Sequence, residues 1–475
     1  MPRPLPGRVA RLSASSGTDG RPAGGGPAGG ADGLPMPRRT FAVIAISLSI
    51  AVTVLDSSMV NVALPGIARE LGIAPATATW LLNAYQLTVV TTLLPLASLG
   101  ETLGFRRVFL GGFALFAAAS LGAALAAHSI EGLLAFRILQ GLGASAVMSL
   151  TAGLIRHTYP ARQLGRAIGI NAMVVAVSGA SAPSLAAGIL AVAPWPALFA
   201  VHVLPALAGI VVGYAALPRV AGTGRPFDAA SAALNVLSFG LVFLGLDLLL
   251  HAPAPAAVLL AIGIAAGVAL VRRQLAQPAP LLPLDLLRVR VIALSVAASV
   301  CAFSAWYAAY VSMPFLLQAQ GFTQVATGLV MTPWPLGMAI SAPNAGRLSD
   351  RVPTAILCMI GMAAMAAGLA VMAFAPLAGQ GVLIGAMMFV CGAGFGCFST
   401  PNNRTMLGSA PKARSGSAGG MQATARLLGT TTGTTTVAIC FQLAGSGEGP
   451  QVGLVAAIGF ALAAGLLSLT RQRLG

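Results

Sequence analysis

The chain has 475 residues, of which 57% are hydrophobic and only 8% are Asp, Glu, Lys or Arg. A soluble domain usually carries about 25% charged residues, so this composition and a mean hydropathy of +0.87 exclude a water-soluble protein and indicate a polytopic membrane protein. The formal net charge of +16 does not indicate nucleic-acid binding, because the basic residues follow membrane topology.

The first 39 residues differ from the rest of the chain. The stretch RPAGGGPAGGADGLP is rich in Gly and Pro and cannot bury a core, so we predict a disordered cytoplasmic tail over residues 1–39. Met36 is an alternative start, which leaves open whether residues 1–35 are translated. We interpret PRRTF at 37–41 as the basic flank of a first span rather than as an export signal.

Apolar runs of about 20 residues, the length of a membrane-crossing helix, recur along the remaining chain. The weak ten-residue alternation of a membrane β-barrel is absent from the sequence. We therefore predict an all-α polytopic membrane protein with fourteen transmembrane helices. The predicted spans are 41–64, 77–99, 107–127, 132–154, 167–192, 197–217, 230–250, 256–273, 291–317, 324–344, 353–375, 380–400, 417–442 and 450–470.

Basic residues are concentrated in every second loop between these spans. Arg106 and Arg107 follow the second span, and Arg219 follows the sixth, whereas the intervening loops carry only Arg69. Because Lys and Arg are enriched in cytoplasmic loops, we predict that both termini face the cytoplasm.

Cysteine and histidine residues give no pattern of a metal site. The five cysteines lie in apolar runs without metal-ligand spacing, so we predict neither a disulfide framework nor a metal centre. The histidines are scattered near span ends, and we predict interfacial positions for them. They are His128, His157, His202 and His251.

Two sequence patterns recur about 250 residues apart, which indicates an internal duplication. Leu99 with Glu101 matches Leu348 with Asp350, and the pattern P-x4-G-x-A-x-G occurs near 160 and again near 411. Two similar halves with a site at mid-membrane are typical of secondary transporters. We predict a six-helix bundle at 40–217, two extra helices at 218–275 and a second six-helix bundle at 276–475.

Three motifs carry a family resemblance. LDSSMVNVALP at 55–65 resembles the first-span motif L-D-x-T-x-V-N-V-A-L-P, and RILQGLGAS at 137–145 resembles the fourth-span motif R-x-x-Q-G-x-G-A. GRLSDR at 346–351 resembles the loop motif G-x-L-x-D-R. On these residues the chain resembles the major facilitator superfamily, and within it the fourteen-span drug:proton antiporters, over residues 41–470.

The resemblance implies proton-driven export of lipophilic or cationic small molecules across a bacterial inner membrane. It implies no cofactor besides the proton motive force, no enzymatic activity and a functional monomer in the lipid bilayer. The chain departs from the family in the first-half loop, where Glu101 replaces Asp, and in span 6, where His202 takes an Asn position. The residues assigned to conformational switching are Glu101, Gly104, Arg106, Arg107, Asp350 and Pro183.

Asp56 lies in the middle of an apolar span, where a charge costs about 2.5–3.5 kcal/mol on insertion scales. Burial disfavours an ionised carboxyl group, so such a residue can bind and release a proton as its surroundings alternate between wet and closed. The resemblance puts Asp56 in this proton-coupling role with Arg137 as a nearby charge. The alternative is a permanent pair that only holds helices together. For Asp247, near the outer end of span 7, we favour a snorkelling side chain or a local pair.

Trp306, Tyr310 and Met313 share one helix face by their spacing, and aromatic faces attract lipophilic cations while Met adapts to irregular shapes. A simple packing face is the alternative. The candidate substrate-cavity residues are Asn61, Tyr85, Gln86, Gln140, Trp306, Tyr310, Met313 and Arg426.

Other functions stay open at this point. An exporter specific for one endogenous metabolite would share these features. A membrane-embedded transferase would need an acid/base pair that the scattered histidines do not supply, and a sensor would usually add a soluble domain.

Overall fold

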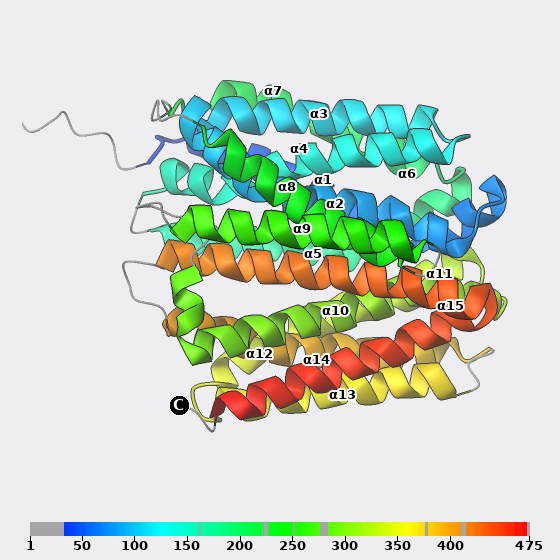
Figure 1. The fold of residues 1–475 in the computed structure, drawn as a ribbon. Coiled ribbons are helices and arrows are strands. Elements are labelled where there is room, and N and C mark those ends of the chain that lie inside the picture. Colours follow the sequence, from blue (N-terminus) through cyan, green and yellow to red (C-terminus); the bar gives the residue numbers. More distant parts are fainter. Residues whose placement is uncertain are drawn as a thin grey trace, which may run out of the picture. The chain divides into compact units, whose positions relative to one another are not determined.

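The structure, a computed structural model, describes residues 33–160, 163–220, 222, 227–249, 252–275, 284–375, 379–409 and 415–472. Figure 1 shows long helices running roughly parallel or antiparallel to one another, as expected for an all-α membrane protein. Within the described residues, thirteen helical segments are long and apolar enough to cross a membrane. The all-α polytopic prediction is therefore confirmed for this part of the chain.

The helices follow the predicted order. The first seven are α1 (Arg38–Leu71), α2 (Pro75–Leu103), α3 (Phe105–Leu125), α4 (Ile130–Thr158), α5 (Leu164–Val192), α6 (Ala197–Ala200) and α7 (Val203–Ala216). Next come α8 (Ala229–Leu248), α9 (Pro253–Leu275) and the short 3-10 helix η2 (Leu284–Arg288). The last six are α10 (Arg290–Ala319), α11 (Gln324–Met331), α12 (Pro333–Leu348), α13 (Thr354–Phe374), α14 (Gly381–Gly408) and α15 (Ser415–Gln472).

The predicted tail of 1–39 lies mostly outside the described residues. Its described end is already part of the fold, because α1 begins at Arg38 and the backbone amide of Leu34 donates to the carbonyl of Thr158 at 3.0 Å. The predicted boundary is thus a few residues too late, since the basic flank of the first span is itself helical.

Two predicted spans are broken in the structure. The run predicted at 197–217 forms α6 and α7, which are separated at Val201 and His202. The run predicted at 324–344 forms α11 and α12, which are separated at Thr332. The break at Thr332 coincides with Pro333 at the start of α12, because proline lacks the amide hydrogen that would continue α11.

The difference between fourteen predicted spans and thirteen observed segments arises in α15. The last segment, Thr424–Arg471, has 48 residues and overlaps both of the last two predicted spans. Gly445 lies inside it with φ 69° and ψ −173°, a conformation that is not helical and that favours glycine. The chain therefore changes direction there.

Local sequence explains several helix ends. α1 ends where Gly72 adopts the left-handed conformation with φ 63°. α4 begins after Ser129, whose side chain accepts a hydrogen bond from the Gly132 amide, and α8 begins after Asp228, which caps Ser231 in the same way.

The helices bury two large apolar cores and pack tightly at small residues. α1 packs against α5 and α7, α2 packs against α4, and α3 also packs against α4. α10 packs against α15, and α14 packs against α12 and α13, whereas α8 and α9 pack mainly against each other (Figure 1). At Gly392 in α14 the backbone of Trp334 comes so close that a β-carbon would collide with the Trp334 carbonyl.

Candidate functional site

Asp56 in α1 and Arg137 in α4 form a fully buried ion pair. Both side chains are 0% exposed, and Nη1 of Arg137 donates to Oδ2 of Asp56 at 2.5 Å. Nε2 of Gln140, one turn after Arg137, donates to the other carboxylate oxygen at 3.2 Å. Both oxygens of the carboxylate are therefore bound by groups on α4.

Arg137 connects this pair to α2. Its Nε donates to the Leu81 carbonyl at 2.8 Å, and its guanidinium lies 4.3 Å from the centroid of the Tyr85 ring. Gln140 extends the network to α3, because its Nε2 also donates to Oγ of Ser120 at 2.8 Å. The cluster thus joins four helices, whereas the resemblance implied Arg137 only as a nearby charge.

His202 is a member of this neighbourhood that the sequence analysis missed. Its residue exposure is 2%, its Nδ1 lies 3.8 Å from Oδ1 of Asp56, and its ring meets Phe116 edge to face at 6.4 Å. Neither ring nitrogen has a hydrogen-bond partner among the described residues. The prediction of an interfacial position is wrong for His202, because the break between α6 and α7 turns this residue inward.

The other histidines differ from His202. His128 and His157 are exposed, and His251 lies outside the described residues. One sequence feature distinguishes His202 from the other histidines: it lies in the span-6 motif, at the position where the family has Asn.

An aromatic cavity of about 130 Å³ lies next to the buried cluster. Tyr85 belongs to both, since its ring stacks on Arg137 and also lines the cavity. Opposite it, α10 contributes Trp306, Tyr307 and Tyr310, and the Trp306 ring lies 4.7 Å from that of Phe395. The cavity therefore brings α1 and α2 together with α10 and α15.

The predicted cavity residues divide into two groups. Tyr85, Gln86, Trp306, Tyr310 and Arg426 line the cavity. Asn61, Gln140 and Met313 do not.

Each of these three has another environment. Asn61 donates from Nδ2 to the Tyr310 carbonyl at 2.6 Å and so links α1 to α10, while Gln140 belongs to the Asp56 cluster. Met313 is fully buried in the apolar core, although its spacing from Trp306 and Tyr310 suggested a shared face.

The predicted switch residues occupy several helix ends. Glu101 is exposed in the last turn of α2, and Gly104 joins α2 to α3 with φ 100°. Asp350 forms an exposed ion pair with Arg404 at 2.5 Å. Pro183 lies inside α5, where its carbonyl faces Gly328 of α11. The side chain of Asp247 lies outside the described part of the chain.

Comparison with other proteins places this architecture among transporters. Residues 46–434 match the Major Facilitator Superfamily. The chain is 42% identical over 443 residues to the "Uncharacterized transporter YebQ" of Escherichia coli (strain K12), covering 92% of this chain and 96% of that protein.

Two more distant relatives carry names of substrates or phenotypes. "Riboflavin transporter RibZ" of Clostridioides difficile (strain 630) is 28% identical, with 84% of this chain and 87% of that protein covered. "Multidrug resistance protein Stp" of Mycobacterium tuberculosis (strain CDC 1551 / Oshkosh) is 30% identical, with 82% and 74% covered.

A solved structure shows the same fold. The inward-facing, unoccupied crystal structure of a bacterial homolog to the human lysosomal transporter Spinster superposes with a TM-score of 0.66 at 16% identity, covering 93% of this chain and 98% of that chain. The chain is therefore a multi-pass membrane transporter rather than an enzyme, and it belongs to the Major Facilitator Superfamily.

Proposed function

We propose that the protein exports hydrophobic or cationic small molecules across the bacterial cytoplasmic (inner) membrane in exchange for protons. The observation that carries this proposal is the Asp56 carboxylate, which is fully buried in a polar cluster beside an aromatic cavity. Tyr85 connects the two, because its ring contacts Arg137 and also lines the cavity. The relative of this chain that is named multidrug resistance protein Stp supports hydrophobic or cationic compounds as the class of substrate.

The proposed architecture has fourteen spans, because Gly445 divides α15 into two membrane-crossing segments. Residues 40–217 and 276–475 then form two six-helix bundles, and residues 218–275 contribute α8 and α9 as an additional pair. With basic loops on the inside, both termini face the cytoplasm. Rocking of one bundle against the other would expose the cavity to each side in turn.

Proton coupling follows from the charge balance of the cluster. When Asp56 is ionised, it neutralises Arg137 and ties α1 to α4. A proton on Asp56 removes that attraction and leaves the guanidinium with the Leu81 carbonyl, Gln140 and the Tyr85 ring. Since a buried unpaired charge is unfavourable, Arg137 must then shift or become solvated. Because Tyr85 contacts Arg137 and lines the cavity, a shift of Arg137 would change the wall of the proposed substrate site.

His202 extends this proton pathway. Its unbonded Nδ1 faces Asp56 from the α6–α7 break, on the side of the carboxylate that Gln140 approaches. An imidazole in this position can receive the proton from Asp56 or supply it, which an Asn at the same position cannot do.

A second candidate function is export of one flat endogenous metabolite. Arg426 lines the cavity among aromatic rings, and a guanidinium attracts an acidic or carbonyl group of a planar compound. The relative that is named a riboflavin transporter supports this second function. A substrate panel separates the two, because the first function requires several unrelated transported compounds and the second requires one.

Reconstituted protein provides the direct test. Proteoliposomes containing a pH-sensitive dye should show a change in lumenal pH on addition of a transported compound. Asp56→Asn should abolish that change while the variant remains in the membrane. A substrate-dependent pH change of normal size in Asp56→Asn would rule out the proposed coupling.

A further inference from the structure

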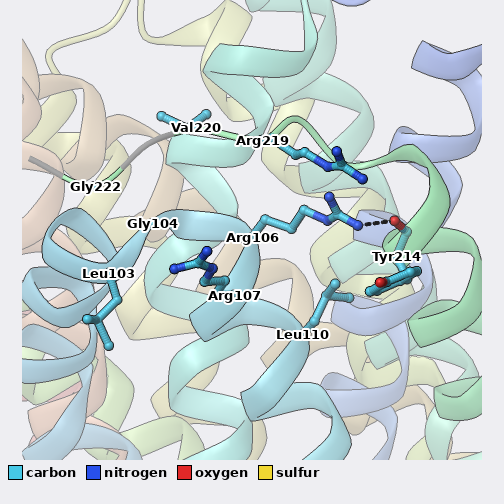
Figure 2. A pocket seen from close by; sticks show the side chains of 9 residues that line it. All are labelled: Leu103, Gly104, Arg106, Arg107, Leu110, Tyr214, Arg219, Val220 and Gly222. Atoms are coloured by element: carbon cyan, nitrogen blue, oxygen red, sulfur yellow. Dashed lines mark hydrogen bonds between the residues drawn. The ribbon is translucent and has the colours of Figure 1, made fainter.

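A second cavity, unrelated to the aromatic one, opens at the junction of α3 and α7. Its volume is about 770 Å³, within the range of about 300–1,000 Å³ that holds small-molecule ligands. Leu103, Gly104, Arg106, Arg107 and Leu110 line it from the α2–α3 turn and α3. Tyr214 of α7, together with Arg219, Val220 and Gly222, completes the wall. Figure 2 shows the side chains of Arg106, Arg107 and Arg219, which line this space.

The cavity carries positive charge without a carboxylate to balance it. Among the described residues none that lines the cavity is acidic, and no ion pair there involves Arg106, Arg107 or Arg219. Arg106 donates to the Tyr214 carbonyl and stacks over the Tyr214 ring at 4.9 Å (Figure 2). Arg219 is close enough to repel the charge of Arg106. Three such groups around one cavity favour an anion.

Neighbouring charges do not fill this role. Arg38 adds a further positive charge near Arg106, and its Nε and Nη2 donate to the carbonyls of Ala216 and Leu217. The terminal segment 1–32 contains four Arg and two Asp, so its charge has the same sign as the cavity. Neither Arg38 nor the terminal segment supplies an anion to the cavity, so we look to another molecule for it.

The other walls of the cavity are apolar and face outward. Tyr214 is 70% exposed and Leu103 is 51% exposed, although both belong to the end of a membrane-crossing helix. A soluble anion such as phosphate gains nothing from these side chains. A phospholipid gains binding energy from both kinds of side chain. Its phosphate can contact the arginines while its acyl chains lie along Leu110, Leu103 and Tyr214.

The cavity is built by a close approach of two turns. Gly104 adopts φ 100°, and a β-carbon there would lie 2.8 Å from the Val220 carbonyl oxygen. Gly222 packs in the same way against the Thr102 carbonyl. These glycines allow the segment after α7 to lie directly on the α2–α3 turn, which brings Arg219 into the same cavity as Arg106 and Arg107.

We propose that this cavity binds the headgroup of an anionic phospholipid of the cytoplasmic leaflet. The concentration of basic residues in alternate loops puts this end of α3 and α7 on the cytoplasmic side, where basic pockets between helices bind anionic lipid headgroups. The proposal does not depend on which compound the protein transports or on proton coupling.

The test compares lipid binding of purified protein and variants in detergent. Native mass spectrometry measures retention of phosphatidylglycerol against phosphatidylcholine during titration. In Arg106→Gln/Arg219→Gln, phosphatidylglycerol affinity should fall about fivefold for each arginine, or about thirtyfold for both. The matched control is Arg156→Gln/Arg351→Gln, which removes two exposed positive charges outside the cavity and should keep the affinity within about twofold.

Three results would overturn the proposal: equal losses in both double variants, no selectivity for phosphatidylglycerol over phosphatidylcholine, or displacement of the lipid by inorganic phosphate at equal concentration. The last result would assign the cavity to a free anion. If the Gln pair fails to fold, the exposed Arg107→Gln provides the same comparison, and Arg106→Lys/Arg219→Lys, which keeps both charges, should retain most of the lipid affinity.

Discussion

Replacing Asp56 by Asn tests the buried cluster most directly. The substitution keeps the size of the side chain but removes its negative charge, so Arg137 stays buried with only neutral partners. The remaining contacts of Arg137 are the Leu81 carbonyl at 2.8 Å, Gln140 Oε1 at 3.0 Å and the Tyr85 ring at 4.3 Å. These contacts solvate the guanidinium in part but do not balance its charge.

The magnitude follows from the burial of both partners. Removing one member of a buried ion pair costs about 3–5 kcal/mol, because the other charge is left uncompensated. The neutral partners retained around Arg137 favour the lower end, so we expect Asp56→Asn to lower the free energy of unfolding by about 3 kcal/mol. Arg137→Gln should lower the free energy of unfolding by a similar amount, since Gln140 is then the one remaining hydrogen-bond donor to Asp56 among the described residues.

The double variant Asp56→Asn/Arg137→Gln separates stability from transport. With both charges gone, most of the penalty should disappear, leaving a loss of about 1–2 kcal/mol. Unfolding by sodium dodecyl sulfate in mixed micelles measures the free energies of the four proteins. Proteoliposome assays on the same preparations should find proton-coupled transport absent in all three variants.

Two results would refute this reasoning. If the two single variants and the double variant lose stability additively, the pair is not coupled and the 2.5 Å contact does not describe the protein. If the stability-restored double variant also transports in exchange for protons, Asp56 is a structural residue and the permanent-pair interpretation is correct.

Three further variants test other parts of the structure. His202→Asn should make transport depend less steeply on pH, because it removes a titratable group whose Nδ1 lies 3.8 Å from Asp56; an unchanged pH profile would exclude His202 from the proton pathway. Arg426→Gln should reduce affinity for acidic substrates about tenfold and spare neutral ones, as uptake competition would measure, and equal effects on both would contradict the role of its charge. Gly392→Ala should lower stability by about 1–3 kcal/mol through collision with Trp334, whereas Gly459→Ala, which has open space, should be nearly neutral by the same unfolding assay.

Hydropathy and motif spacing predicted most of the fold. Each predicted span overlaps a helix, and the first-span and fourth-span motifs correctly identified Asp56 and Arg137 as neighbours. This success has a simple reason: in lipid every backbone polar group must be bonded within its own segment, so a long apolar run has few alternatives to a helix.

Breaks in the helices were much harder to predict from sequence. The interruption between α6 and α7 lies in a continuous apolar run, and His202 at that break was assigned to the interface. Likewise, Gly445 is one of 57 glycines in the chain, and its neighbouring sequence does not show that it adopts φ 69° inside a long helix. Such positions depend on packing against neighbouring helices.

The sequence by itself determined the membrane class, the helical segments and the identity of the buried charges, because these depend on how single residues partition between water and lipid. Only the tertiary structure decided which polar groups meet. It brought His202 to Asp56, separated Met313 from the aromatic cavity and placed Arg219 in one cavity with Arg106. These contacts join residues far apart in the chain, and their distances depend on how whole helices pack, which local spacing does not encode.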